Sequence, residues 1–211
     1  MIYDLSGKVP CLLVVDVQQE YFDENGPAYV EAAEVALPQI NQLVQVFSDA
    51  GRPVVYIRHA HHPDGSDVGR MGDFAAAGEE DSFIEGTARV GFAAGLHLIS
   101  TAPVVTKTRY DSFAATDLRA LLQGLDVTSV AIVGFMTSFC CTSTARSAHA
   151  LDYEVLFVRD AIDGPDLARA DGSTYPRNEV LDDVCDQLAA GFAEIVTTTE
   201  QIGRASCRER V

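Results

Sequence analysis

Three residues that could react together each follow an apolar run of the sequence. Asp16 follows Leu-Leu-Val-Val, Lys107 follows Val-Val-Thr, and Cys140 follows Val-Gly and a short loop. A carboxylate beside a cysteine can take the thiol proton and later give it to a leaving amine. A lysine close to both would stabilise the thiolate and help to position the carboxylate. If the three runs are parallel strands, their ends meet in one crevice, and the residues form a nucleophilic triad without histidine.

The local setting of Cys140 is the clearest of the three. It lies between the apolar run 128–134 and a segment typical of a helix, so the thiol falls at a strand-turn-helix junction. The unpaired N–H groups of a first helical turn favour thiolate over thiol and can hold an oxyanion. Taken singly, Cys140 fits a small buried hydrophobe equally well, Asp16 fits a buried helix cap, and Lys107 fits a surface side chain. Their joint placement favours catalysis.

The elements that must position these residues alternate along the chain. Six short β-branched runs predict buried strands over 11–16, 53–58, 103–107, 130–134, 154–159 and 193–197. Apolar spacing and flanking Thr or Gly residues predict helices over 32–50, 116–124, 140–151 and 178–190. This alternation predicts a Rossmann-like α/β protein, a three-layer α/β/α sandwich with a six-stranded, mainly parallel sheet. Because no linker or repeat interrupts it, residues 1–202 are predicted to form a single domain.

Two stretches do not follow the alternation. Residues 59–100 are rich in Gly and Asp, have weak periodicity, and follow the second strand at the edge where α/β proteins bind ligands. We predict that they form the wall of a substrate pocket. Residues 203–211 have no apolar periodicity and are predicted to be a C-terminal tail that is disordered or foreign to the native protein.

The composition limits the partners of the protein more than its substrates. A net charge of -16 would repel nucleic-acid phosphates and anionic membrane surfaces, so we expect neither as a partner. The five cysteines are odd in number, include an adjacent pair and form no C-x-x-C motif, which argues against a disulfide framework. The sequence has no signal-peptide pattern and no apolar run of membrane-spanning length. We therefore expect a soluble, cytoplasmic protein that acts on a small molecule.

Four motifs, in order along the chain, resemble those of one known family. Residues 134–148 fit the pattern G-x-x-T-x-x-C-V-x-x-T-A-x-x-A in nearly every fixed position, and residues 107–118 fit K-x-x-x-S-x-F-x-x-T-x-L. Residues 13–22 contain an Asp followed two residues later by Gln, and residues 155–161 end a strand with Asp-Ala. These motifs resemble the isochorismatase-like cysteine hydrolases, which include nicotinamidases, N-carbamoylsarcosine amidohydrolase, biuret hydrolase and ureidoacrylate amidohydrolases. The resemblance runs from about residue 9 to about residue 199.

The resemblance implies an isochorismatase-like fold and a role for each triad residue. Asp16 would be the general base and later the general acid, Lys107 its electrostatic partner, and Cys140 the nucleophile. The family places a cis peptide bond shortly before the cysteine, which here falls between Phe135 and Met136. The backbone N–H groups of Met136 and Cys140 would form the oxyanion hole.

Two positions depart from the family pattern. Met136 stands where many members carry a smaller Thr or Ala, which would narrow the pocket. Cys141 stands where Val is usual, and we expect it to be a buried substitute for that Val. Neither departure removes a reacting group.

Six residues close to the expected strand ends are candidates to contact the substrate. They are Tyr21, Phe22, Arg58, His59, His61 and Phe135. For Arg58 and the histidines, a role as solvated loop residues is an equally good interpretation.

The histidines also raise the question of a metal. Nicotinamidases carry an Asp-x-His pair after this strand and use it, with a further His, to bind zinc or another divalent ion. Here His59 stands at the Asp position, and the next histidine after His62 is His97, so no complete ligand set is visible. We therefore expect no cofactor and no metal.

Together, these observations predict a cysteine-dependent hydrolase of a small non-peptide amide, ureide or N-carbamoyl compound, acting through a thioester on Cys140. Three alternatives stay open: a vinyl-ether hydrolase of the isochorismatase type, which does not need the thiol; a metal-dependent nicotinamidase; and a non-catalytic binding module. Because members of the family are commonly dimers or tetramers, the resemblance implies a homodimer or homotetramer.

Overall fold

All six predicted strands are present in the computed structural model, which describes residues 2–74 and 82–205. They are β1 (Pro10–Val15), β2 (Val54–His59), β3 (Val104–Lys107), β4 (Ser129–Phe135), β5 (Glu154–Asp163) and β8 (Glu194–Val196). They form one sheet in the order β3-β2-β1-β4-β5-β8, and every neighbouring pair is parallel. The central strands read as continuous apolar runs because both of their faces are buried.

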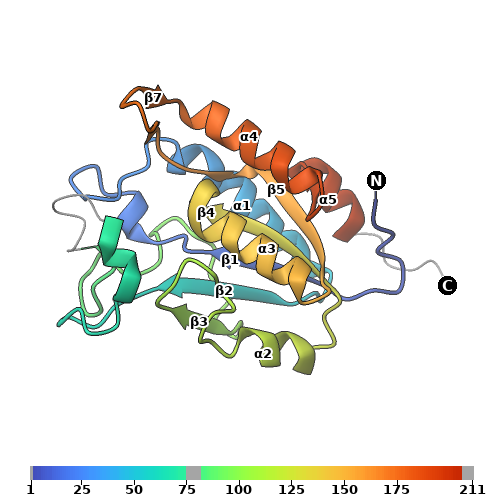
Figure 1. Ribbon diagram of the computed structural model, residues 1–211. Coiled ribbons are helices and arrows are strands. Elements are labelled where there is room, and N and C mark those ends of the chain that lie inside the picture. Colours follow the sequence, from blue (N-terminus) through green and yellow to red (C-terminus); the bar gives the residue numbers. More distant parts are fainter. Residues whose placement is uncertain (1, 75–81, 206–211) are drawn as a thin grey trace.

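Helices cover both faces of this sheet (Figure 1). They are α1 (Ala33–Asp49), α2 (Leu118–Gly124), α3 (Thr142–Ala150), α4 (Arg177–Ala189) and α5 (Thr198–Ala205). Helices α1 and α5 pack on one face, and α2, α3 and α4 pack on the other. The predicted three-layer α/β/α sandwich is therefore confirmed.

Strand β1 shows how the alternation of side chains divides the core. Leu12 and Val14 pack with the α1 layer, whereas Leu13 and Val15 pack with the layer of α2, α3 and α4. Successive side chains of a strand point to opposite faces, so a fully apolar strand contributes to two cores at once. Burial of each such side chain stabilises the fold by about 1.5–3 kcal/mol.

The order of the strands creates the crevice in which the candidate site lies. After β1 the chain builds β2 and β3 on one side, and then returns to build β4, β5 and β8 on the other. The carboxyl end of β1 therefore lies at the point where the direction of the winding reverses. Open α/β sheets bind their ligands at such points.

The structure contains elements that the sequence did not predict. A 3-10 turn, η1 (Gln19–Tyr21), follows β1, and another, η2 (Gly69–Phe74), lies in the long segment after β2. Two short strands, β6 (Leu167–Ala168) and β7 (Thr174–Tyr175), form an antiparallel pair. Strand β5 also continues to Asp163, past the predicted end at residue 159, because its register against β4 shifts between Ile132 and Gly134 and pairing resumes beyond the shift.

The last helix enters the segment that was predicted to be a tail. Helix α5 ends at Ala205, and the guanidinium of Arg204 lies 2.6 Å from a carboxylate oxygen of Glu194 at the start of β8. Residues 203–205 are thus part of a helix, and residues 206–211 lie outside the described residues. Within 2–74 and 82–205, no helix has the length and apolar character needed to cross a membrane.

Candidate active site

The sheet brings Asp16, Lys107 and Cys140 into direct contact. The ammonium nitrogen Nζ of Lys107 lies 2.8 Å from Oδ2 of Asp16 and 3.1 Å from Sγ of Cys140. Lys107 ends β3, two strands away from β1, so its long side chain crosses the end of β2 to reach Asp16. The same nitrogen donates a hydrogen bond to the backbone carbonyl of Arg109, at 3.0 Å. The side chains of Asp16 and Lys107 are fully buried, and Cys140 is 2% exposed.

Asp16 takes an unusual backbone conformation at the end of β1. Its φ angle is +51°, a left-handed value that Asp tolerates better than most residues. The neighbouring strand end needs a glycine, because a Cβ on Gly134 would lie 2.0 Å from the carbonyl oxygen of Val15. Strands β1 and β4 can therefore approach closely just where they deliver the carboxylate and the thiol.

Cys140 lies in a π-helical turn, η4 (Thr137–Cys141), rather than at the start of an ordinary α-helix. The peptide bond between Phe135 and Met136 is cis, as the resemblance implied. The carbonyl of Met136 then accepts hydrogen bonds from the N–H groups of Phe139 and Cys141, both at 3.2 Å. Single π turns of this kind are frequent at functional sites. Here the turn precedes α3 and places the thiol within the first helical turns.

Burial dominates the electrostatics of the three groups. It raises the pKa of Asp16 above its ordinary value, against the opposing effect of Lys107. It also raises the pKa of Cys140 to about 12, because the attraction of Lys107 is weaker than burial and is offset by Asp16. For Lys107, burial opposes the charge, but Asp16 and Cys140 outweigh it and raise the pKa.

This result corrects one expectation. The sequence predicted that the helical N-terminus would favour thiolate, whereas burial and the neighbouring carboxylate keep Cys140 protonated at neutral pH. The nucleophile therefore needs a base, and Asp16, with its raised pKa, is a stronger base than an ordinary aspartate.

Two polar contacts connect the segment after β3 with the helix after Cys140. The Oγ1 atom of Thr144 accepts a hydrogen bond from the N–H group of Ser112 at 3.1 Å, and the two hydroxyl oxygens lie 2.7 Å apart. One turn further along α3, the hydroxyl of Ser147 donates to Asp111 at 2.7 Å. The segment that carries Lys107 is therefore fixed to the helix that follows the nucleophile.

Aromatic side chains form one wall of the site. Tyr21 packs against Phe135 with ring centroids 5.4 Å apart, and against Phe83 at 5.5 Å. Phe22 meets the edge of Phe135 at 5.8 Å. Burial, followed by Cys140 and Asp16, raises the pKa of Tyr21 well above its ordinary value. Three of the six predicted substrate contacts, Tyr21, Phe22 and Phe135, therefore lie together.

His59 lies beside the triad, and His61 contacts His59. One ring nitrogen of His59 lies within 4.8 Å of a carboxylate oxygen of Asp16 and of Sγ of Cys140. Nε2 of His59 lies 2.9 Å from Nε2 of His61. Both rings are buried.

Arg58 does not join them. It precedes His59 on β2, so its side chain points to the opposite face of the sheet. There its guanidinium pairs with the carboxylate of Glu85 at 2.9 Å.

Three residues to which the sequence analysis gave no role hold this region together. The side-chain amide of Gln18 donates to the carbonyls of His59 and Val90, at 2.8 and 2.7 Å, and its oxygen accepts from the N–H of His59 at 2.8 Å. Phe83 stacks on the ring of His59 at 4.8 Å, and Asp67 contacts His61. Gln18 belongs to the Asp-x-Gln motif of residues 13–22, and this motif could have marked it as a functional residue. Phe83 and Asp67 lie in the segment without periodicity, and no pattern marked them.

The donor atoms at the triad do not fit a divalent metal ion. Asp16, His59 and Cys140 are close enough to share an ion, but the ammonium of Lys107 already contacts both the carboxylate and the sulfur. A second cation there would be repelled. The predicted alternative, based on the histidines after β2, fares no better, because the Nε2 atoms of His59 and His61 face each other and His62 and His97 are exposed. Within the described residues, no third ligand completes that pair.

Comparison with known proteins places this geometry in one family. Residues 10–200 match the isochorismatase domain. Nicotinamidase 3 of Arabidopsis thaliana is 28% identical over 199 residues, which cover 92% of this chain and 87% of that protein. Maleamate amidohydrolase of Pseudomonas putida is 26% identical over 156 residues, which cover 74% of this chain and 73% of that protein. The crystal structure of a cysteine hydrolase from Pseudomonas syringae pv. phaseolicola 1448A superimposes with a TM-score of 0.89 at 28% identity, covering 93% of this chain and 92% of that one.

Proposed function

Because the chain belongs to the isochorismatase family of hydrolases, we propose that it is a cysteine hydrolase of small non-peptide amides, ureides or N-carbamoyl compounds. One observation carries the proposal: the ammonium of Lys107 contacts both the carboxylate of Asp16 and the sulfur of Cys140. A base, a cation and a nucleophile within hydrogen-bond distance are the parts that thioester chemistry requires.

Acylation would begin with transfer of the thiol proton from Cys140 to Asp16. The thiolate, paired with Lys107, attacks the carbonyl carbon of the substrate, and the C–S bond forms. The negative oxygen is held by the backbone N–H groups of Met136 and Cys140. Asp16 then protonates the leaving nitrogen, the C–N bond breaks, and ammonia or an amine departs.

Deacylation would follow by attack of water on the thioester, with release of a carboxylic or carbamic acid and return of the thiol. Lys107 stabilises the thiolate both when it attacks and when it is expelled. Because the site is buried, these charge interactions are stronger than they would be in water. The aromatic wall of Tyr21, Phe22 and Phe135 would exclude bulk water and face an apolar part of the substrate.

The experiment is a panel of small amides, ureides and N-carbamoyl compounds, nicotinamide and maleamate among them, scored by release of ammonia or amine. The wild-type protein is expected to turn over at least one class, and Cys140→Ala is expected to reduce that rate to background. Cys141→Val, at a buried cysteine next to the nucleophile, is the matched control and should keep the activity. Full turnover by Cys140→Ala would overturn the proposal.

The same variant separates the proposal from vinyl-ether hydrolysis, which does not need the thiol. If Cys140→Ala keeps the ability to cleave isochorismate while the amide panel stays silent in the wild type, the alternative reaction is the correct one. If wild-type Cys140 reacts with iodoacetamide no faster than the buried Cys11 and Cys185, the chain is a binding module.

We also propose that the enzyme works in the cytoplasm as a homodimer or homotetramer. The absence of a C-x-x-C motif and the odd number of cysteines support a reducing compartment. Light scattering on a size-exclusion column measures the assembly, and a monomer at all concentrations would contradict the oligomer.

A further inference from the structure

A chain of three side chains leads from the reacting centre towards the surface. A ring nitrogen of His59 lies within 4.8 Å of an oxygen of Asp16 and of the sulfur of Cys140. The Nε2 atoms of His59 and His61 are 2.9 Å apart, and Nδ1 of His61 is 3.3 Å from Oδ1 of Asp67. The side chains of the two histidines are buried, whereas that of Asp67 is 24% exposed. The triad mechanism uses none of these three residues.

The protonation state of Asp67 and His61 sets the direction of these hydrogen bonds. Partial burial of Asp67 is outweighed by a hydrogen bond from the N–H of His62 and by His61, so its pKa is lowered and the carboxylate accepts only. Burial lowers the pKa of His61, so this ring is neutral and its Nδ1 carries the proton that Asp67 accepts. Nε2 of His61 is then an acceptor.

The same logic fixes the tautomer of His59. Since Nε2 of His61 accepts, Nε2 of His59 must donate. Burial, followed by Lys107, His61 and Arg109, lowers the pKa of His59 well below its ordinary value, so this ring is also neutral. Its Nδ1 therefore carries the basic lone pair of the ring. A neutral histidine held in one tautomer by a carboxylate is the arrangement in which imidazole acts as a base.

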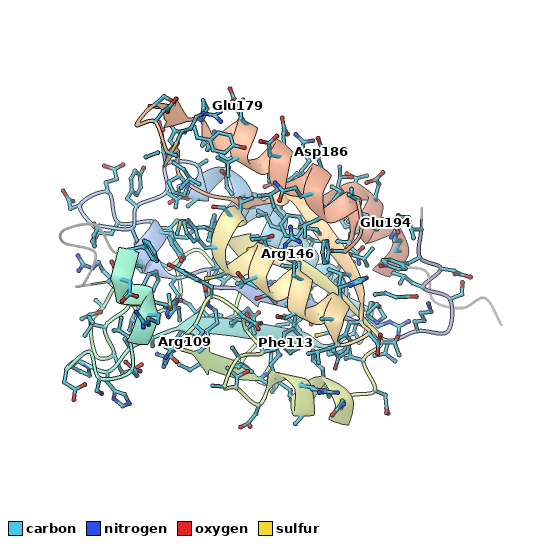
Figure 2. The ribbon with its side chains drawn as sticks, in the orientation of Figure 1. Arg109, Phe113, Arg146, Glu179, Asp186 and Glu194 are labelled. Carbon is cyan, nitrogen blue, oxygen red and sulfur yellow. The ribbon has the colours of Figure 1, made fainter. Side chains whose placement is uncertain are left out.

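The surrounding contacts hold the rings in this arrangement. Gln18 binds both backbone groups of His59, and Phe83 stacks on its ring with an angle of 18° between the planes. Arg109, which follows β3 and is labelled in Figure 2, donates to the backbone carbonyl of Asp67 at 2.7 Å. The chain of side chains is thus attached to β1, β2 and the segment after β3.

A ring nitrogen of His59 lies within 4.8 Å of an oxygen of Asp16 and of Sγ of Cys140, so His59 can reach the reacting atoms directly or through one water. We propose that His59 accepts a proton from the water that cleaves the thioester, and that His61 and Asp67 are positioning residues that keep His59 in its accepting tautomer. This inference rests on the proposed function and identifies the base for deacylation, the second half of that reaction.

The protons and bonds balance in this step. Water loses a proton to Nδ1 of His59 as its oxygen bonds to the thioester carbon. His59 can release its Nε2 proton to His61, so the positive charge moves towards the carboxylate of Asp67. When the tetrahedral intermediate collapses, the C–S bond breaks and the thiolate is expelled beside Lys107. The proton then returns through His59 to Asp16 and Cys140, which restores the resting enzyme.

The test uses 4-nitrophenyl acetate, an activated acyl donor that reports the two half-reactions separately without knowledge of the natural substrate. The initial burst of nitrophenolate measures acylation of Cys140, and the later steady rate measures deacylation. We expect His59→Phe, which keeps a ring to stack on Phe83, to keep the burst rate within about threefold and to lower the steady rate by about 10²-fold. Intact-protein mass spectrometry should then show an acetyl group accumulating on the variant.

His62→Phe is the matched control, since His62 is exposed and its ring has no place in the chain; it should behave like the wild type. A steady rate of His59→Phe within a few-fold of the wild type, or an equal fall of burst and steady rates, would overturn the inference. The proposed function would instead be overturned if the wild-type protein gave no burst, or if the burst persisted in Cys140→Ala.

Asp67 provides an independent test of the positioning role, because its carboxylate acts on His59 through the ring of His61, while it also accepts a hydrogen bond from the N–H of His62. Asp67→Asn can donate to Nδ1 of His61 and so favours the opposite tautomers, whereas Asp67→Glu keeps an acceptor. We expect Asp67→Asn to slow deacylation by about 10-fold or more and to shift its pH profile, and Asp67→Glu to restore most of the rate. Wild-type deacylation in Asp67→Asn would contradict the role.

Discussion

Ser112 and Thr144 are joined by a backbone-to-hydroxyl hydrogen bond of 3.1 Å and by hydroxyl oxygens 2.7 Å apart, and both side chains are fully buried. Ser112 follows β3 by a few residues, and Thr144 lies one turn after Cys140. The pair therefore sets the distance between the strand that delivers the cation and the helix that follows the nucleophile.

Thr144→Val should remove this connection while keeping the shape of the side chain. We expect a loss of about 1–3 kcal/mol of unfolding free energy, because the buried N–H of Ser112 loses its acceptor. The burst rate with 4-nitrophenyl acetate should also fall. Thr142→Val, in the same helix but partly exposed, is the control and should change neither quantity by much. Equal behaviour of the two variants in urea unfolding would contradict the prediction.

Lys107→Met should destabilise the fold as well as abolish activity. It leaves the fully buried carboxylate of Asp16 without a cation, and breaking a buried pair in this way costs about 3–5 kcal/mol. The double variant Asp16→Asn with Lys107→Met removes both charges, so we expect it to recover part of that loss in urea unfolding. A single variant as stable as the wild type would show that the pair is not coupled.

Asp16→Asn should slow acylation, because the thiol of Cys140 has a high pKa and loses its base. Burial, the largest cause of the raised pKa of Cys140, persists in this variant, so direct ionisation supplies little thiolate at neutral pH and acylation depends on Asp16. We expect the burst rate at pH 7 to fall by about 10²–10⁴-fold and to rise with pH over the alkaline range. In the wild type the burst should instead lose rate on the acid side, as Asp16 is protonated at a pH above its ordinary pKa. Overlapping pH profiles would contradict Asp16 as the base.

The stability of the protein should fall with acid in a way that depends on His59. Because the pKa of His59 lies well below 6.5 in the folded chain, the unfolded chain binds protons first when the pH falls below that value. The contribution of the neutral, buried His59 to the unfolding free energy is therefore fully present above about pH 6.5 and is lost as the pH falls. We expect His59→Phe to lose less unfolding free energy between pH 7 and pH 5, by up to about 1.4 kcal/mol per pH unit in that window. Parallel pH profiles would rule this out.

Gly134→Ala should be severe, although it adds a single methyl group. The φ angle of Gly134 is +116°, and the new Cβ would lie 2.0 Å from the carbonyl oxygen of Val15. The strands would have to separate at the site, so we expect a loss of several kcal/mol and of activity. Gly124→Ala, which meets nothing within 4 Å, is the control for circular dichroism and urea unfolding.

The sequence predicted the sheet well because buried parallel strands are apolar along their whole length. It predicted the proximity of Asp16, Lys107 and Cys140 for the same reason, since residues at the carboxyl ends of such strands must meet. It could not predict that Cys140 would be protonated, because that depends on how completely the fold excludes water. It also could not place Asp67 or Phe83, whose roles depend on the path of a segment without periodic pattern.

The extent of β5 and α5 shows a further limit. Strand β5 continues to Asp163 only because its register against β4 shifts, which no local pattern marks. Helix α5 reaches Ala205 with the help of the Arg204–Glu194 pair, a contact made across the fold and not by neighbours in the helix. Local sequence patterns cannot predict the ends of elements that depend on such long-range contacts.

The three reacting residues come from β1, β3 and the turn after β4, separated by about ninety residues and then by about thirty. A chain that has not yet assembled its sheet therefore carries only an ordinary cysteine, without its base or its cation. Catalytic competence must appear late, when the two halves of the sheet join at β1. After dilution from denaturant, the recovered activity should thus report the fraction of molecules with a fully assembled sheet. It should lag behind the recovery of the helical circular dichroism signal.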